Sequence, residues 1–143
     1  MQFATRVGEP RTVAYGLVGF GFFGTVGAQA TAKLVAVSLI GTSALVWSTK
    51  WLVNRERPDQ DRNRANSSFP SGHATGAAAL AVLVARRHGR LGWLAWGAAL
   101  FIGLSRIYLG RHFPSDVVSG YLLGTIVSWI VIRGENWFQK LHF

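Results

Sequence analysis

Residues 69–85 of the chain read FPSGHATGAAALAVLVA, in which a proline, a serine and a glycine precede a long run of small and apolar residues. The Pro70-Ser71-Gly72 triplet predicts the start of a helix, whose free N–H groups and positive dipole end favour an anion. The run behind it is apolar on every face, whereas a surface helix of a soluble protein has one apolar stripe. Its length lies at the lower end of the range for a membrane span, roughly 17–25 residues. The stretch therefore predicts a membrane helix with an anion-binding first turn.

Four more apolar stretches have about the length of a span, at residues 12–28, 34–53, 91–109 and 117–132. Together the five predict an all-α integral membrane bundle of about five transmembrane helices, in one domain that covers residues 1–143. A soluble all-helical bundle is the alternative, which the apolar faces disfavour.

Small and aromatic residues support the membrane interpretation. Glycines recur four residues apart, at Gly72/Gly76 and Gly120/Gly124, which lets helix backbones approach closely in lipid. Tryptophans lie near the proposed helix ends, as interfacial belts require. They are Trp47, Trp51, Trp93, Trp129 and Trp137.

Composition excludes several other classes of protein. Half of the 143 residues are hydrophobic and 15% are charged, against about 25% charged residues in soluble domains. The chain has no cysteine, which excludes a disulfide framework, a thiolate nucleophile and a cysteine-based metal site. Its net charge is +9, but the basic residues form no continuous stripe or reading motif, so we predict no nucleic-acid partner. Anionic lipid headgroups and a phosphorylated substrate explain the charge better. Residues 1–10 show no signal-peptide pattern, so we expect the hydrophobic segments to direct insertion.

The polar residues fall into three blocks that the topology brings together. The blocks are Lys50-x6-Arg57-Pro58, Pro70-Ser71-Gly72-His73 and Ser105-Arg106-x5-His112-x3-Asp116. Each apolar stretch reverses the direction of the chain, so the 54–68 segment and the 106–116 segment are expected at the same end of the bundle. The 86–90 turn is expected at the opposite end.

The convergent side chains suit a phosphate group. Lys50, Arg57 and Arg106 are cations at or near membrane depth, where a charge is expensive and usually functional. Arginine offers a planar fork that matches phosphate oxygens, and lysine offers a compact point charge. Gly72 lets the backbone come close to the anion, and the Ser71 hydroxyl adds a donor.

Two histidines then suggest a covalent mechanism. An unprotonated His112 can accept a phosphoryl group on a ring nitrogen, and Asp116 can orient the ring through the other nitrogen, as in a catalytic triad. His73 is positioned to act as general acid and then as general base. Each residue also has a simpler interpretation, since a histidine at a helix start is often a cap and an aspartate before an apolar run is usually an N-cap. The joint pattern favours catalysis.

The three blocks resemble those of the type 2 phosphatidic acid phosphatase and vanadium haloperoxidase superfamily, and every defined position of its pattern is matched. The resemblance implies that His112 is the nucleophile, Asp116 its orienter and His73 the acid/base. It also implies a phosphate cradle without a metal or other cofactor, made of Lys50, Arg57, Ser71, Gly72 and Arg106. Membrane members commonly have six spans, one more than the five counted here, with the difference at the N-terminal end.

The predicted function is that of a membrane lipid phosphatase. Its substrate would be phosphatidic acid, phosphatidylglycerol phosphate or a polyprenyl diphosphate such as undecaprenyl diphosphate, and its other partner is the bilayer itself. The alternatives are a vanadate-dependent haloperoxidase, whose relatives are soluble and larger, and a non-catalytic membrane anion-binding protein, which would not need both histidines. The resemblance favours a bacterial cell membrane with the active site on the extracytoplasmic side. The positive-inside rule does not decide the side, because six Lys and Arg on each face remain once the three proposed ligands are set aside.

Overall fold

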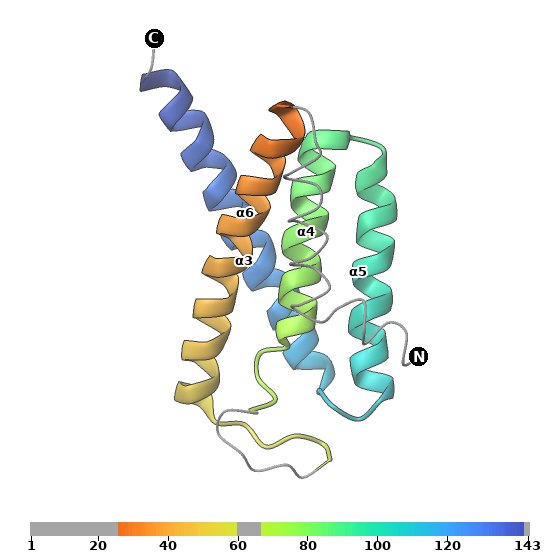
Figure 1. Ribbon diagram of the computed structural model, residues 1–143. Coiled ribbons are helices and arrows are strands. Elements are labelled where there is room, and N and C mark those ends of the chain that lie inside the picture. Colours follow the sequence, from red (N-terminus) through yellow and green to blue (C-terminus); the bar gives the residue numbers. More distant parts are fainter. Residues whose placement is uncertain (1–25, 60–66, 142–143) are drawn as a thin grey trace.

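The computed structural model of the protein describes residues 26–59 and 67–141, which form four helices and no strand (Figure 1). The helices are α3 (Val26–Val53), α4 (Gly72–His88), α5 (Leu91–Tyr108) and α6 (Pro114–Leu141). Consecutive helices run in opposite directions, so the segments 54–59, 67–71 and 109–113 lie at one end of the bundle and the 89–90 turn lies at the other. The all-α prediction is confirmed for the described residues.

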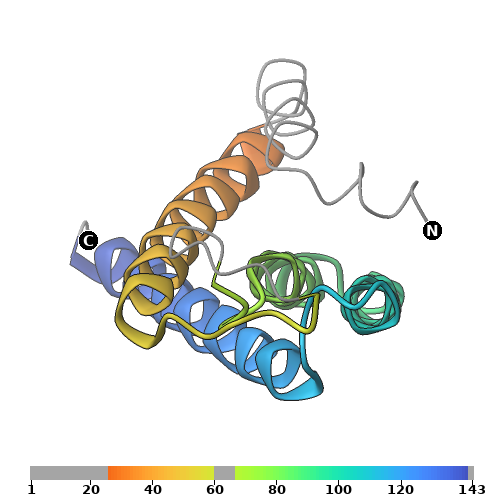
Figure 2. The ribbon, with the colours of Figure 1, turned by 90° about the horizontal axis from the view of Figure 1, so that it is seen from below.

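Helix α4 is the centre of the bundle. It packs against α3, α5 and α6, and the view along the bundle shows it between the other three helices (Figure 2). Its buried face consists mostly of alanine, which takes little space, and Leu83 is its largest fully buried residue. Leu83 packs with Val35 and Ile132 in an apolar cluster that holds α3, α4 and α6 together. A helix that neighbours cover on several sides does not need bulky apolar residues facing lipid.

The contact between α4 and α6 depends on two glycines. A Cβ atom added to Gly124 would lie 2.1 Å from the carbonyl oxygen of Thr75, and one added to Gly120 would lie 2.7 Å from that of Ser71. The backbones of the two helices therefore touch, as the four-residue glycine spacing predicts. Gly72 and Gly76 face α3 instead, and their nearest side-chain atoms, 3.5 and 3.8 Å from the added Cβ, leave room for a larger residue. The prediction of close backbone approach therefore holds for Gly120 and Gly124 but not for Gly72 and Gly76.

Three of the described helices are long and apolar enough to cross a membrane: Ala30–Val53, Leu91–Tyr108 and Pro114–Glu135. Their outward faces carry large apolar side chains such as Ile40, Leu52 and Leu94. Trp47, Trp51, Trp93 and Trp129 are all exposed, as lipid-contacting or interfacial tryptophans are. With 17 residues, α4 is shorter than these three helices.

Some predicted helix boundaries are wrong. The break expected at residues 29–33 is absent, because α3 runs without interruption from Val26 to Val53. A single lysine, Lys33, lies in this segment without a glycine or proline to stop the helix, and its long side chain is exposed. Helix α6 continues beyond residue 132 to Leu141. The stretch predicted at 12–28 lies largely outside the described residues, so the count of five helices stays a prediction.

Candidate active site

Four helix ends meet where the three sequence blocks converge. Helices α3 and α5 end here with Lys50 and Arg106 in their last turns, where cations complement the negative end of the helix dipole. Helices α4 and α6 begin here, so their positive dipole ends face the same region. The bundle therefore brings two cationic side chains and two helix N-termini to one end (Figure 1). The predicted convergence of the three blocks at this end is observed.

Helix α4 begins as the sequence predicts. Ser71 is the N-cap residue, and its buried hydroxyl oxygen accepts a hydrogen bond from the N–H of Ala74 at 3.5 Å. The Ser71 N–H donates to the main-chain oxygen of Asp116 at 3.0 Å, which ties the start of α4 to the first turn of α6. The hydroxyl thus has a structural partner, and its donation to a phosphate stays a prediction.

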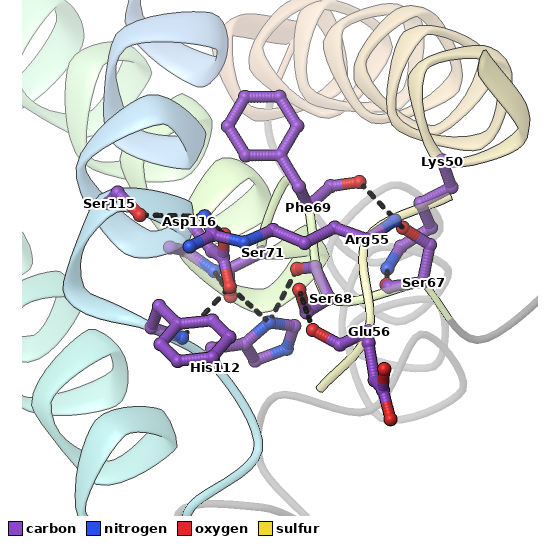
Figure 3. A network of polar contacts seen from close by, with 12 residues as sticks. Lys50, Arg55, Glu56, Ser67, Ser68, Phe69, Ser71, His112, Ser115 and Asp116 are labelled. Carbon is purple, nitrogen blue, oxygen red and sulfur yellow. Dashed lines mark hydrogen bonds and ion pairs between the residues drawn. The ribbon is translucent and has the colours of Figure 1, made fainter. Parts of the chain in front are cut away.

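Helix α6 begins at Pro114, whose missing N–H makes proline suitable for a first helical position. The Asp116 side chain reaches back so that its Oδ2 accepts from the N–H of Phe113 at 2.8 Å, which is half of a capping box. Its Oδ1 accepts from Nη1 of Arg55 at 2.8 Å. The carboxylate is fully buried, so these partners offset a large desolvation cost. Asp116 is therefore both a helix cap and the centre of a polar network (Figure 3).

His112 lies beside Asp116 but bonds to another group. Its Nδ1 is 2.7 Å from the main-chain oxygen of Ser68 and 3.9 Å from Oδ2 of Asp116, which is too long for a hydrogen bond. Because a carbonyl oxygen can only accept, Nδ1 must carry the proton, and Nε2 keeps its lone pair. The predicted bond between Asp116 and the ring is absent, because the Ser68 carbonyl makes the direct contact with Nδ1 instead (Figure 3).

The surroundings keep His112 neutral. The ring is 4% exposed, and burial, together with the positive charges of Arg57 and Lys50, lowers the pKa of His112 from 6.5 to about 4, against the opposing effects of the Ser68 hydrogen bond and Asp116. At neutral pH the imidazole is therefore unprotonated, as a nitrogen nucleophile must be.

The Ser68 carbonyl is held by hydrogen bonds between the two ends of the 54–68 connection. We call these two ends, residues 55–56 and 67–68, the neck of the connection. The Ser68 N–H donates to the main-chain oxygen of Arg55 at 2.9 Å, and the Ser68 hydroxyl donates to that of Glu56 at 3.1 Å. The Arg55 N–H donates to the Ser67 hydroxyl at 2.9 Å, and Nζ of Lys50 donates to the Ser67 carbonyl. The two sides of the neck are thus joined to each other and to the end of α3.

The remaining predicted site residues lie at the same end of the bundle. Arg106 is buried, with its Nε 3.3 Å from the Ser105 hydroxyl. Arg57 is half-buried and close enough for its charge to act on His112. Gly72 and the half-buried His73 are the first two residues of α4. The network drawn in Figure 3 brings together four of the predicted residues. They are Lys50, Ser71, His112 and Asp116.

Sequence reasoning missed several participants in this network, among them the Ser68 carbonyl and Arg55. The Ser68 carbonyl belongs to the main chain, so no residue type marks it. Arg55 left only a weak signal, because it lies two residues before the predicted ligand Arg57. As for metals, residues 26–59 and 67–141 contain no group of three or more His, Asp or Glu side chains placed to hold an ion.

Comparison with known proteins defines the class of the chain. Residues 31–140 match the family model described as the PAP2 superfamily. The match covers most of the chain and includes all three sequence blocks. The protein is therefore a member of the PAP2 superfamily, and the family predicted from the sequence is confirmed.

Individual relatives are lipid phosphatases or share the fold. The chain is 36% identical over 69 residues to undecaprenyl-diphosphatase BcrC of Bacillus subtilis, an alignment that covers 48% of this chain and 36% of that protein. It is 31% identical over 112 residues to phosphatidylglycerophosphatase B of the same organism, covering 68% and 55% of the two chains. The chain thus spans from about a third to about half of the length of these relatives. The crystal structure of Aquifex aeolicus LpxE superposes with a TM-score of 0.78 at 28% identity, covering 92% of this chain and 82% of that one. Because the chain belongs to the PAP2 superfamily and three of its described helices are apolar enough to cross a membrane, it is an integral membrane protein of the PAP2 type.

Proposed function

We propose that the chain is an integral membrane lipid phosphatase that cleaves a phosphomonoester or diphosphate lipid through a phosphohistidine on His112. The observation that carries the proposal is the state of that ring. It is buried and neutral, and the Ser68 carbonyl holds its Nδ1 so that Nε2 keeps its lone pair. A structural cap has no need of an imidazole whose pKa is lowered by burial and, to a smaller extent, by two nearby cations.

The reaction has two steps in this proposal. The Nε2 lone pair attacks phosphorus, the bond from phosphorus to the leaving oxygen breaks, and His73 gives that oxygen a proton. The phosphorylated imidazole then carries a positive charge, which the Ser68 carbonyl and the Asp116 carboxylate stabilise. In the second step a water molecule gives a proton to His73 and attacks phosphorus, which releases inorganic phosphate and restores His112.

Catalysis of phosphoryl transfer consists mostly of positioning and charge stabilisation. Lys50, Arg57 and Arg106, with Ser71, Gly72 and the first turn of α4, supply positive charge and donors for the equatorial oxygens. We infer that the reaction needs no metal, because these groups can do the electrostatic work of divalent ions and the chain has only six acidic residues.

The first experiment is a phosphate-release assay on the purified chain in detergent, with phosphatidic acid, phosphatidylglycerol phosphate and undecaprenyl diphosphate as substrates. We expect turnover of at least one lipid, undiminished by excess EDTA and inhibited by vanadate, which would occupy the cradle as a five-coordinate mimic. A loss of activity in EDTA that magnesium restores would refute the metal-free mechanism. Absence of turnover with every lipid would refute the proposed function.

We also propose that the active site faces the extracytoplasmic side of a bacterial cell membrane. Since the chain has no cysteine, single-cysteine variants can be labelled without background. Asp59→Cys lies at the active-site end and Arg90→Cys lies at the opposite end, both exposed. On intact cells an impermeant maleimide should label Asp59→Cys alone. Labelling of Arg90→Cys alone would reverse the orientation.

A further inference from the structure

Arg55 lies outside the assigned phosphate cradle and catalytic set, yet three groups of the α6 start hold its guanidinium. Nη1 donates to Oδ1 of Asp116 and to the hydroxyl of Ser115, each at 2.8 Å. The guanidinium also lies 4.3 Å from the centre of the Phe113 ring, a cation–π contact. Figure 3 shows the side chain extending from the neck of the 54–68 connection to Asp116.

We propose that Arg55 is a positioning residue, which holds the Asp116 carboxylate beside the His112 ring and away from a direct bond with it. This inference rests on the proposed function. The carboxylate is fully buried, with its two oxygens divided between two donors, Arg55 on Oδ1 and the Phe113 N–H on Oδ2. This division sets the 3.9 Å gap to Nδ1 and leaves that nitrogen to the Ser68 carbonyl.

Removal of the guanidinium changes this balance. Oδ1 would lose a charged hydrogen-bond donor. A buried carboxylate oxygen without a donor carries a desolvation penalty, which a new donor would relieve. The imidazole Nδ1–H already lies 3.9 Å from Oδ2, so the carboxylate should turn toward His112 and compete with Ser68 for this donor. The ring would tilt, and Nε2 would lose its alignment with phosphorus.

Arg55 also links the two partners of the ring. Its main chain bonds to Ser67 and Ser68, and its side chain bonds to Asp116. One residue thus sets the positions of both the carbonyl and the carboxylate that face His112. Lysine can reproduce the charge, but its point charge cannot reproduce the planar contact with Phe113.

The chain provides a matched control. Nη1 of Arg111 pairs with Oδ2 of Asp59 at 2.8 Å, the same distance as in the Arg55–Asp116 pair, and this pair also joins the segment after α3 to the region where α6 begins. The difference is burial, because the Asp59 side chain is 29% exposed and that of Asp116 is fully buried. Exposed ion pairs contribute little, so Arg111→Gln should leave turnover within about twofold of the wild type.

The test compares Arg55→Gln, Arg55→Lys and Arg111→Gln in the full chain. Arg55→Gln should lower kcat by about 100-fold, the effect of a small misplacement of reacting groups, with little change in KM. Arg55→Lys should recover part of that loss. In the Asp116→Asn background Arg55→Gln should cause no further loss, because both residues act through the same carboxylate.

The pH profile gives a readout that a merely structural role would not move. The charged groups facing the ring are Lys50 from α3, Arg57 from the loop and Asp116 from α6. Burial and the two cations lower the pKa of His112 to about 4, and Asp116 opposes them. With Arg55→Gln, the carboxylate comes closer and is less compensated, so the acid limb of kcat/KM should move upward. Comparing variants on one substrate cancels the ionisation of the substrate.

Three results would overturn the inference: a normal kcat in Arg55→Gln, a loss that adds fully to that of Asp116→Asn, or a rise in KM alone, which would make Arg55 a substrate ligand. Failure of the proposed function is distinguishable, because the wild type would then release no phosphate. In that case the ring titration of His112, followed by NMR in wild type and Arg55→Gln, decides the positioning role. An upward shift supports it and an unchanged titration refutes it.

Discussion

Replacing His112 by alanine should reduce phosphate release to the background of the assay. The substitution removes the nitrogen that we propose accepts the phosphoryl group, and removal of a nucleophile in a comparable covalent mechanism costs on the order of 10⁶ in kcat. The cations and the α4 start remain, so vanadate should still bind, measurably by calorimetry. The ring is also the partner of the Ser68 carbonyl, so thermal unfolding should be followed in parallel.

His88→Ala is the matched control for this variant. His88 is the last residue of α4, exposed and at the end of the bundle opposite the site. It should retain the turnover of the wild type. An active His112→Ala variant would eliminate the phosphohistidine, and the two-step mechanism with it.

Asp116→Asn should lower kcat by up to about 10⁴, the loss seen when a triad aspartate becomes its amide. Because the Ser68 carbonyl still holds Nδ1, the loss here comes from the missing charge rather than from a wrong tautomer. In the proposed mechanism the carboxylate stabilises the positive charge that the phosphorylated imidazole carries, and a neutral amide does not. The structure adds a second effect. Both carboxylate oxygens accept hydrogen bonds, so the amide NH₂ of asparagine must face a donor, at a cost in unfolding free energy of about 1–3 kcal/mol.

Asp59→Asn separates these effects from a general loss of an ion pair, since Asp59 pairs with Arg111 at the protein surface. Its kcat and melting temperature should stay near those of the wild type. If the kcat of Asp116→Asn were close to that of the wild type while its melting temperature was lower, Asp116 would keep only its role as a helix cap.

The sequence predicts well the features that depend on local signals. Ser71 caps α4 and Pro114 opens α6 because an N-cap hydroxyl and a first-turn proline satisfy backbone groups within a few residues. The start of α3 is predicted poorly. Lys33 and its polar neighbours lower hydropathy without breaking the backbone, and hydropathy measures transfer to lipid rather than helix termination.

In the site, too, some features can be predicted from the sequence and others cannot. The topology alone brings Lys50, His112 and Asp116 to one end of the bundle. The detailed contacts depend on differences of a few tenths of an ångström in the distances between residues far apart in the chain. Differences of that size decide which group is a hydrogen-bond partner. Thus the Ser68 carbonyl, from a residue 44 positions away, takes the bond to His112 that the sequence pattern assigns to Asp116.

The glycine contact between α4 and α6 divides the molecule into two parts that can evolve at different rates. The backbones of the helices that carry His73 and Asp116 touch at Gly120 and Gly124, so the main chain sets the separation of these two helix starts. The exposed faces of α3 and α5, with residues such as Ile40, Leu52 and Leu94, bear no such constraint. If the chain is the proposed lipid phosphatase, selection for a different lipid tail can change those faces while the geometry of the proposed site stays intact. One chemistry can in this way be adapted to many lipids.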